Sequence, residues 1–319
     1  MLRLLVANES LHETQSYGHI TVDGVPWHVI DGSKWLEKGN TYACISYAWG
    51  NITVPNPIYG GSNIMSIRTM SVLETAIRTL VEASPIAIWI DAFCLPPRGD
   101  PTRTQGIDEI GKVYSAASKA IVVLSETSKP FLQLASVELK GQAGMEHMHT
   151  MENLEKDLWV TRVWTYQEIA NCNDQGWLFV AEGDPEAIAV TGVSFLNMLG
   201  NIRAAYKREY RRPDGTVLRE ADTEVSLCLR LPNVSMLEDV LADCILEIPL
   251  EHSALQIMSN VNRQFRERGE DYFNSMIGAI SHPVESASVG ETSKKVLKFV
   301  TCANWFTPLS ISTERKKRH

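Results

Sequence analysis

The residues best suited to chemistry in this sequence are a tryptophan and a glutamate four positions apart, Trp164 and Glu168. Residues with this spacing share one face of a helix, so the indole ring and the carboxylate would lie side by side. An aromatic ring can stack on a flat cationic group, while a carboxylate stabilises positive charge. The alternative is that Trp164 packs in the core and Glu168 is an ordinary surface acid, and the spacing alone favours this alternative.

Alternating strand-like and helical segments must position these two residues. Four apolar runs have the length and composition of buried strands: residues 42–47, 86–90, 120–124 and 177–181. Segments with apolar residues at helical spacing lie between the runs, and Ser71 with Glu74 forms a capping box at one of them. This alternation predicts βαβ units and a mostly parallel sheet flanked by helices.

The domain organisation follows from the same alternation. We expect an N-terminal extension over residues 1–39 that packs on the sheet, an α/β domain over residues 40–185, and a mainly helical region over residues 186–319 that completes or flanks the domain. The less regular residues 129–157 are interpreted as an insertion. Apolar stripes at helical spacing, such as the one from Phe195 to Tyr206, support the helical assignment of the second half.

The ends of the predicted strands carry the remaining candidate residues. Ser46, Tyr47 and Trp49 lie at the end of the first run, and Asp91 directly follows the second. In open α/β sheets, ligands bind outside the carboxyl ends of the strands. We therefore expect these side chains around one crevice, with Trp49, Asp91 and Trp164 on the same side of the sheet.

Composition and charge narrow the class of protein. The 319 residues are 44% hydrophobic and 21% charged, as is usual for a globular protein with a sizeable core. The formal net charge of −8 argues against a nucleic-acid binder, and no apolar run approaches the roughly 18 residues of a membrane span. The six cysteines are scattered without a CxxC pair, which predicts reduced thiols, no disulfide and a cytoplasmic location.

Three further motifs are weaker. Residues 106–112 match the phosphate-loop spacing GxxxxGK, but Val113 stands where a Ser or Thr must reach Mg²⁺, so an amphipathic helix is favoured. His147 and His149 offer two imidazoles with no third ligand near in sequence, so we predict no metal site. The basic residues 315–318 are interpreted as a charged tail.

Three ordered sequence blocks resemble the heterokaryon-incompatibility (HET) domain family. The blocks are YACISYAWG, IWIDAFC followed by IGKVYSAASKAIVVLS, and RVWTYQE. The family's patterns are approximately ALSYxWG, WIDAICINQ followed by IYxxAxxVxVWLG, and RxWTxQE. The segment EDYFNSMIGAI, at residues 270–280, also resembles a later block of the family. One departure is Leu95-Pro96-Pro97, which stands where the family often has Ile-Asn-Gln.

The resemblance carries implications for fold and function. HET domains drive regulated cell death in fungal non-self recognition and are thought to be similar to TIR domains, which implies a flavodoxin-like (TIR-like) sheet and a role in cell death or innate immunity. The WxxxE spacing of Trp164 and Glu168 is similar to that of the TIR helix that carries the glutamate of NAD-cleaving members. This similarity implies an NAD⁺ glycohydrolase with Glu168 as its catalytic carboxylate.

The same resemblance suggests which residues would bind the substrate. The candidates for stacking against the nicotinamide ring are Tyr47, Trp49 and Trp164. Asp91 is a candidate partner of a ribose hydroxyl, although it equally suits a role in capping its loop.

Three classes of function stay open at this point. The first is an enzyme whose substrate is NAD⁺ or a related nucleotide and which needs no cofactor. The second is a non-catalytic signalling module that acts through self-association, as a homo-oligomer or with a partner signalling protein, and the loss of Ile-Asn-Gln favours it mildly. The third is a helical second half that senses a ligand and gates the first half. For the enzyme, we expect Glu168→Gln to lower the rate with little change in stability, because a glutamate in a wet crevice supports no core packing.

Overall fold

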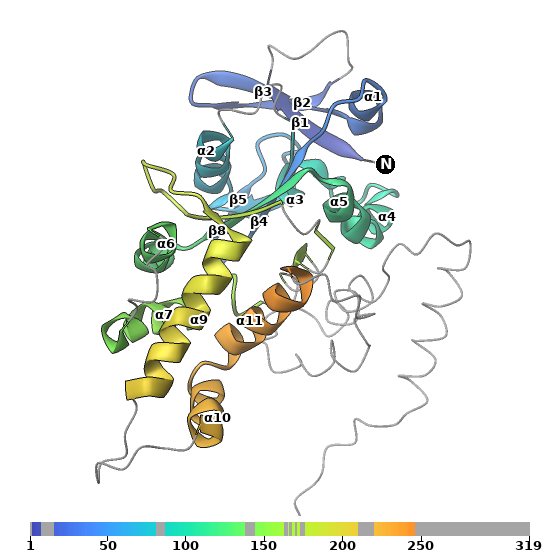
Figure 1. Ribbon diagram of the computed structural model, residues 1–319. Helices are drawn as coiled ribbons and strands as arrows, with labels where there is room; N and C mark the ends of the chain where they lie inside the picture. The colour runs from blue at the N-terminus through green and yellow to red at the C-terminus, as the bar shows by residue number, and fades with distance from the viewer. Residues whose placement is uncertain are drawn as a thin grey trace, which may run out of the picture. The chain divides into compact units, whose positions relative to one another are not determined.

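An eight-stranded mixed sheet lies at the centre of the fold, in the strand order β10-β9-β8-β4-β7-β1-β3-β2. The computed structural model describes residues 2–7, 16–80, 87–137, 144–162, 165, 168–169, 171–172, 176–209 and 220–245. All of them belong to one unit that spans residues 1–282. Figure 1 shows the sheet with helices packed around it.

The four predicted strands are the parallel centre of this sheet. They are β4 (Ala43–Tyr47), β7 (Ala87–Trp89), β8 (Lys119–Leu124) and β9 (Trp177–Ala181). Strand β4 pairs in parallel with β7 on one side and β8 on the other, and β8 pairs in parallel with β9. Numbered along the chain, these strands lie in the order 2-1-3-4, which matches the first four strands of flavodoxin-like sheets. The predicted α/β fold class, with a parallel sheet centre flanked by helices, is therefore confirmed.

Antiparallel strands extend the sheet at both edges. Beside β7 lie β1 (Arg3–Ala7), β3 (Val25–Asp31) and β2 (Ser16–Val22), and β10 (Val190–Thr191) lies beside β9. The N-terminal residues thus lengthen the sheet edge to edge, and the short helix α1 (Gly32–Glu37) leads from β3 back toward β4. A separate hairpin of β5 (Thr53–Pro55) and β6 (Ile64–Ser66) follows β4.

Helices cover both faces of the parallel strands. On one face, Thr69 at the start of α2 (Thr69–Thr79) meets Tyr47 of β4, with 2.8 Å between the two hydroxyl oxygens. On the other face, the hydroxyl of Tyr42 and the thiol of Cys44 donate to the carbonyl of Val113 in α5 (Ile110–Ala116). This alternation is expected, because successive side chains of a strand point to opposite faces. Two further short helices lie between β7 and α5 in the sequence, α3 (Asp91–Cys94) and α4 (Arg103–Asp108).

Two local predictions in this region were wrong. Helix α2 begins at Thr69, with Arg68 as its N-cap and no side-chain cap, so Ser71 lies inside the helix and makes no capping box. The contact between Thr69 and Tyr47 fixes this earlier start. The predicted second helix is divided at Glu109 into α4 and α5, although Ile110 and Tyr114 are buried as expected.

Helices also form most of the segment that was interpreted as an irregular insertion. They are α6 (Lys129–Ser136) and α7 (Met148–Glu155), each preceded by a 3₁₀ turn, Glu126–Ser128 and Met145–His147. Three helices of the second half follow: α9 (Gly192–Glu209), α10 (Glu220–Arg230) and α11 (Pro232–Ile245). None of the helices within the described ranges is long and apolar enough to cross a membrane.

Aromatic contacts join α6 and α9 to the sheet. The rings of Phe179 in β9 and Phe195 in α9 stack with their centroids 4.1 Å apart, and Phe131 of α6 meets Phe195 edge-on at 4.8 Å. The predicted stripe on α9 is buried over its whole length, from Phe195 at 0% exposure to Tyr206 at 1%. Its burial confirms the helical periodicity that was used to assign this segment. The stripe predicted around residues 257–265 and the family-like segment at residues 270–280 lie outside the described residues.

Candidate active site

Glu168 is held at the carboxyl end of β4 by a short chain of hydrogen bonds. The hydroxyl of Ser46, the fourth residue of β4, donates to Oε2 of Glu168. The same hydroxyl oxygen accepts a hydrogen bond from the indole nitrogen Nε1 of Trp159, at 2.6 Å. Ser46 and Trp159 are buried, with 2% and 1% of their surfaces exposed. The carboxyl group of Glu168 is therefore fixed from the protein side rather than free in solvent.

A second carboxylate, that of Asp91, lies at the end of the neighbouring strand β7. Its Oδ2 accepts a hydrogen bond from Nε1 of Trp49 at 2.7 Å, and its Oδ1 accepts one from the backbone nitrogen of Ala92 at 2.6 Å. Trp49 and Asp91 thus lie together at the carboxyl edge of the sheet, as the strand ends predicted. The bond to Ala92 also ties the Asp91 side chain to the backbone directly after β7, where the alternative interpretation gave this residue a local structural role.

The three residues predicted to line the nicotinamide site differ in their exposure or in whether they lie within the described residues. Tyr47 is only 6% exposed, and its hydroxyl contacts that of Thr69, so in the free protein its ring is covered. Trp49 is partly exposed. Trp164 lies outside the described residues, so its predicted place beside Trp49 and Asp91 stays a prediction.

Burial changes the acid–base behaviour of both carboxyl groups. Desolvation raises the pKa of Glu168 to about 8, and the nearby charge of Asp91 acts in the same direction. The hydrogen bond from Ser46 and the positive charge of Arg162 lower the pKa of Glu168, but by less. Desolvation likewise raises the pKa of Asp91 above its usual range, against the hydrogen bond from Trp49. Paired carboxyl groups with raised pKa values are typical of acid–base and electrostatic catalysis.

The raised pKa of Glu168 predicts that its replacement affects stability in a pH-dependent way, in contrast to the small change expected from the sequence. An unfolded chain binds this proton with a pKa near 4.5, whereas the folded protein holds it up to about pH 8. Between these values the folded state binds more protons than the unfolded state, so raising the pH costs stability. We expect the free energy of unfolding of Glu168→Gln to equal that of the parent near pH 5 and to exceed it by about 2–4 kcal/mol near pH 9. This range allows for the partial exposure of the Glu168 side chain. Urea unfolding of both proteins at the two pH values measures this, and equal stability at pH 9 would contradict it.

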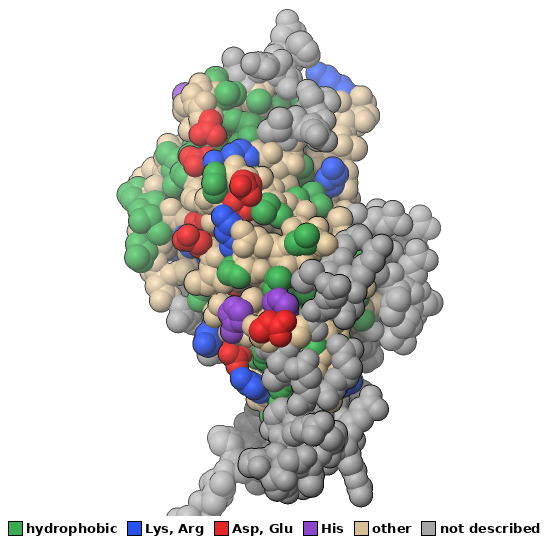
Figure 2. Space-filling view, turned by 60° about the vertical axis from the view of Figure 1, so that its left-hand side comes forward, with side chains coloured by type: hydrophobic (Ala, Val, Ile, Leu, Met, Phe, Trp, Pro, Cys, Tyr) green, Lys and Arg blue, Asp and Glu red, His purple; other side chains and the backbone are tan. Residues whose placement is uncertain are grey.

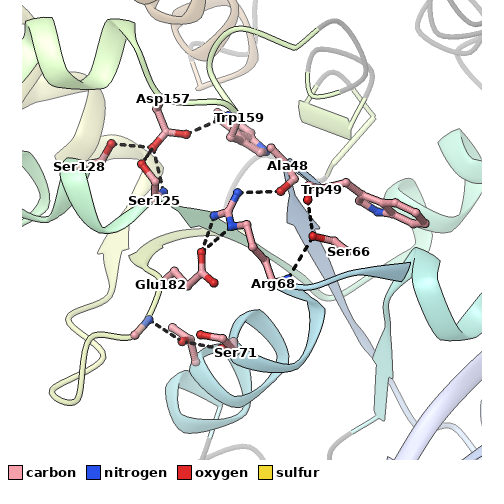
Figure 3. A network of polar contacts seen from close by, with 12 residues as sticks. Ala48, Trp49, Ser66, Arg68, Ser71, Ser125, Ser128, Asp157, Trp159 and Glu182 are labelled. Atoms are coloured by element: carbon pink, nitrogen blue, oxygen red, sulfur yellow. Dashed lines mark hydrogen bonds and ion pairs between the residues drawn. The ribbon is translucent and has the colours of Figure 1, made fainter. Parts of the chain in front are cut away.

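A buried aspartate fixes the turn that carries Trp159. Oδ2 of Asp157 accepts hydrogen bonds from the backbone nitrogen and the hydroxyl of Ser125, at 2.8 and 2.6 Å, and from the hydroxyl of Ser128 at 2.7 Å. Its Oδ1 accepts from the backbone nitrogen of Trp159 at 2.8 Å. Figure 3 shows this carboxylate enclosed by its donors. The carboxylate accepts four hydrogen bonds, three at Oδ2 and one at Oδ1, so Asp157 is a structural anchor between the end of β8 and the Trp159 turn.

An arginine joins the segments that follow β4 and β9. Arg68 donates from Nη1 to the backbone oxygen of Ala48 at 2.7 Å, and from Nε to Oε2 of Glu182 at 2.6 Å. The hydroxyl of Ser66 accepts from the backbone nitrogen of Arg68 and donates to the backbone oxygen of Trp49. Gly50 then has a φ of +70°, a conformation that glycine adopts without strain. These contacts, seen in Figure 3, set the path of the chain that places Trp49.

Sequence reasoning singled out Ser46 only as a strand-end residue, and it missed Trp159, Asp157 and Arg162. The block RVWTYQE begins at Arg162, whose charge acts on both Asp91 and Glu168. Just before this block lie Asp157 and Trp159, whose carboxylate and indole support Ser46. Their proximity to a family-like block was the one signal in the sequence that pointed to them.

The weaker motifs do not form sites in the described part of the chain. Residues 106–112 lie in α4 and α5, as the amphipathic alternative predicted. Among the described residues no group of three His, Cys, Asp or Glu side chains is arranged to hold a metal ion. Cys44, Cys94, Cys172 and Cys228 are free thiols, and burial raises the pKa of Cys44 and Cys94. On the face shown in Figure 2, acidic and basic side chains lie interspersed.

Comparison with known proteins identifies the segment that holds this cluster. Residues 42–168 match the family model of the heterokaryon incompatibility protein (HET). No curated protein and no solved structure matches the chain. The matched segment begins at the strand that carries Ser46 and ends at Glu168, so the two hydrogen-bonded residues lie near its opposite ends. Residues 42–168 of this chain are therefore similar to the HET family.

Proposed function

We propose that this HET-domain protein acts in regulated cell death or immune defence by hydrolysing the nicotinamide–ribose bond of NAD⁺, with Glu168 as the catalytic carboxylate. The observation that carries the proposal is the buried carboxyl of Glu168, which Ser46 holds beside Asp91 at the carboxyl edge of the sheet. Ligands of open α/β sheets bind at this edge. The expected similarity to NAD-cleaving TIR domains is part of the same proposal.

The proposed reaction needs one carboxylate and one water molecule. The bond between C1′ of the ribose and the pyridinium nitrogen breaks, and its electron pair leaves with nicotinamide, which departs neutral. Positive charge then develops on the ribose as an oxocarbenium-like state, which the carboxylate of Glu168 stabilises. Water adds to C1′ and loses a proton, so the products are ADP-ribose, nicotinamide and H⁺. The cationic ring of bound NAD⁺ would favour the ionised form of Glu168, because an opposite charge lowers a carboxyl pKa.

The other predicted residues have supporting roles in this proposal. Trp49 and Trp164 provide aromatic faces for the nicotinamide ring. Asp91, which the indole of Trp49 holds in place, accepts a hydrogen bond from a ribose hydroxyl. The phenol of Tyr47 interacts with Asp91. No cofactor is required, because NAD⁺ is the substrate.

The proposal is tested by incubating the purified chain with NAD⁺ and measuring nicotinamide and ADP-ribose by liquid chromatography. We expect the two products to appear in equal amounts and in proportion to the protein concentration. Light scattering on the same samples reports self-association. An oligomer that releases no nicotinamide, yet still kills cells that express it, would overturn the proposal in favour of the signalling module.

A further inference from the structure

The hydrogen bonds around Ser46 have only one direction. An indole N–H can donate but not accept, so Trp159 Nε1 must donate to the Ser46 hydroxyl oxygen across their 2.6 Å contact. The hydroxyl of Ser46 has a single proton, and its other partner is Oε2 of Glu168. The proton of Ser46 therefore points to Oε2, and the order of donation runs from Trp159 through Ser46 to Glu168.

This direction makes the two oxygens of Glu168 unequal. Oε2 accepts from Ser46 when the carboxyl group is ionised. When Glu168 is neutral, a proton on Oε1 leaves this hydrogen bond in place, whereas a proton on Oε2 weakens that oxygen as an acceptor or reverses the bond. Protonation at Oε1 is therefore the arrangement that preserves the order of donation from Trp159 through Ser46 to Glu168.

We propose that Ser46 is the positioning residue of Glu168, and that the Trp159 indole orients the Ser46 hydroxyl so that Oε1 alone is left to exchange the proton and to face the developing charge of the substrate. This inference rests on the proposed function for its catalytic meaning. Its structural content, which is the control of Glu168 by Ser46, holds independently of any substrate.

Other charged and titratable groups also act on Glu168 and must be held constant in a test. Asp91 after β7 raises its pKa and Arg162 lowers it. Cys44 of β4 and Tyr114 of α5 also interact with the charge of Glu168, and burial raises the pKa of both above neutral pH. Since these two are neutral over the working range, Ser46, Asp91 and Arg162 are the groups that set the charge on Glu168. Of the three, Ser46 accepts from the indole of Trp159, whereas the backbone nitrogen of Arg162 donates to the Trp159 backbone oxygen.

The test removes the hydroxyl and measures the titration of Glu168 directly. The pKa of Glu168 is read from the carboxyl ¹³C shift in full-length protein labelled at glutamate, with Glu168→Gln to assign the signal. Ser46→Ala removes a hydrogen bond that favours the charged form, so we expect the midpoint to rise by about one to two pH units. Thr75→Val is the matched control, because it deletes another buried hydroxyl, one in α2 that donates to the backbone oxygen of Ser71 instead.

Trp159→Phe is the second variant, and it tests the orienting role of the indole. It keeps an aromatic ring but deletes the donor, so we expect a rise in the same direction as in Ser46→Ala, and a smaller one. A Glu168 midpoint that does not move in Ser46→Ala, or that moves equally in Thr75→Val, overturns the inference. A midpoint that moves as expected in a protein that releases no nicotinamide supports the positioning role and rejects the proposed function instead.

Discussion

Replacing Glu168 with Gln is expected to lower the rate of nicotinamide release about 10²–10³-fold. Gln keeps the shape of the side chain and an oxygen that accepts from Ser46, but it removes the charge that the oxocarbenium-like state needs. With a pKa of about 8, only about a tenth of the free protein carries this charge at pH 7. Bound NAD⁺ would increase that fraction. Initial rates at saturating NAD⁺ provide the measurement.

Two further variants control for this result. Glu168→Asp keeps a carboxylate but withdraws it by about one methylene, so a catalytic role predicts a large loss of rate in a folded protein. Glu126→Gln makes the same chemical change at an exposed carboxyl in the turn after β8 and is expected to leave the rate unchanged. A Glu168→Gln protein as active as the parent would show that this carboxylate is not the catalyst.

Replacing Asp157 with Ala is expected to lower the free energy of unfolding by about 3–5 kcal/mol. The change leaves two hydroxyls and two backbone nitrogens without their shared acceptor, and Asp157 is 2% exposed, so water does not readily take its place. Urea unfolding followed by circular dichroism measures the loss.

Asp157→Asn is the matched variant for this anchor. Its single carbonyl oxygen can still accept from Ser125 and Ser128, while its amide group would face the backbone nitrogen of Trp159 and repel it. We therefore expect a loss smaller than that of the Ala variant. A loss below about 1 kcal/mol in Asp157→Ala would contradict the anchoring role.

The parallel centre of the fold was predictable because its signals are local. Strand β8 is a run of β-branched and apolar residues, and a strand buried on both faces needs such a run. Once the strands are placed, the positions of Trp49 and Asp91 follow, because parallel strands end at the same edge of a sheet. The capping box at Ser71 failed because a contact between Thr69 and Tyr47, 22 positions apart, set the start of the helix.

The support around Glu168 was not predictable, because its contacts join distant parts of the chain. Ser46 lies 113 positions before Trp159 and 122 before Glu168. No periodicity or spacing rule connects residues so far apart, and the raised pKa depends on their burial together. The N-terminal strands were missed for a related reason, because β1 pairs with β7, more than 80 positions away.

The dependence of kcat/KM on pH tests most directly whether the buried carboxylate of Glu168 cleaves NAD⁺. This parameter reports the ionisation of groups in the free enzyme. If Glu168 must be ionised, kcat/KM for nicotinamide release rises with pH as one proton is lost, with a midpoint near 8, where burial places the pKa of Glu168. A midpoint near 4.5, the ordinary pKa of a glutamate, or a rate that falls as the pH rises toward 8, would contradict the account.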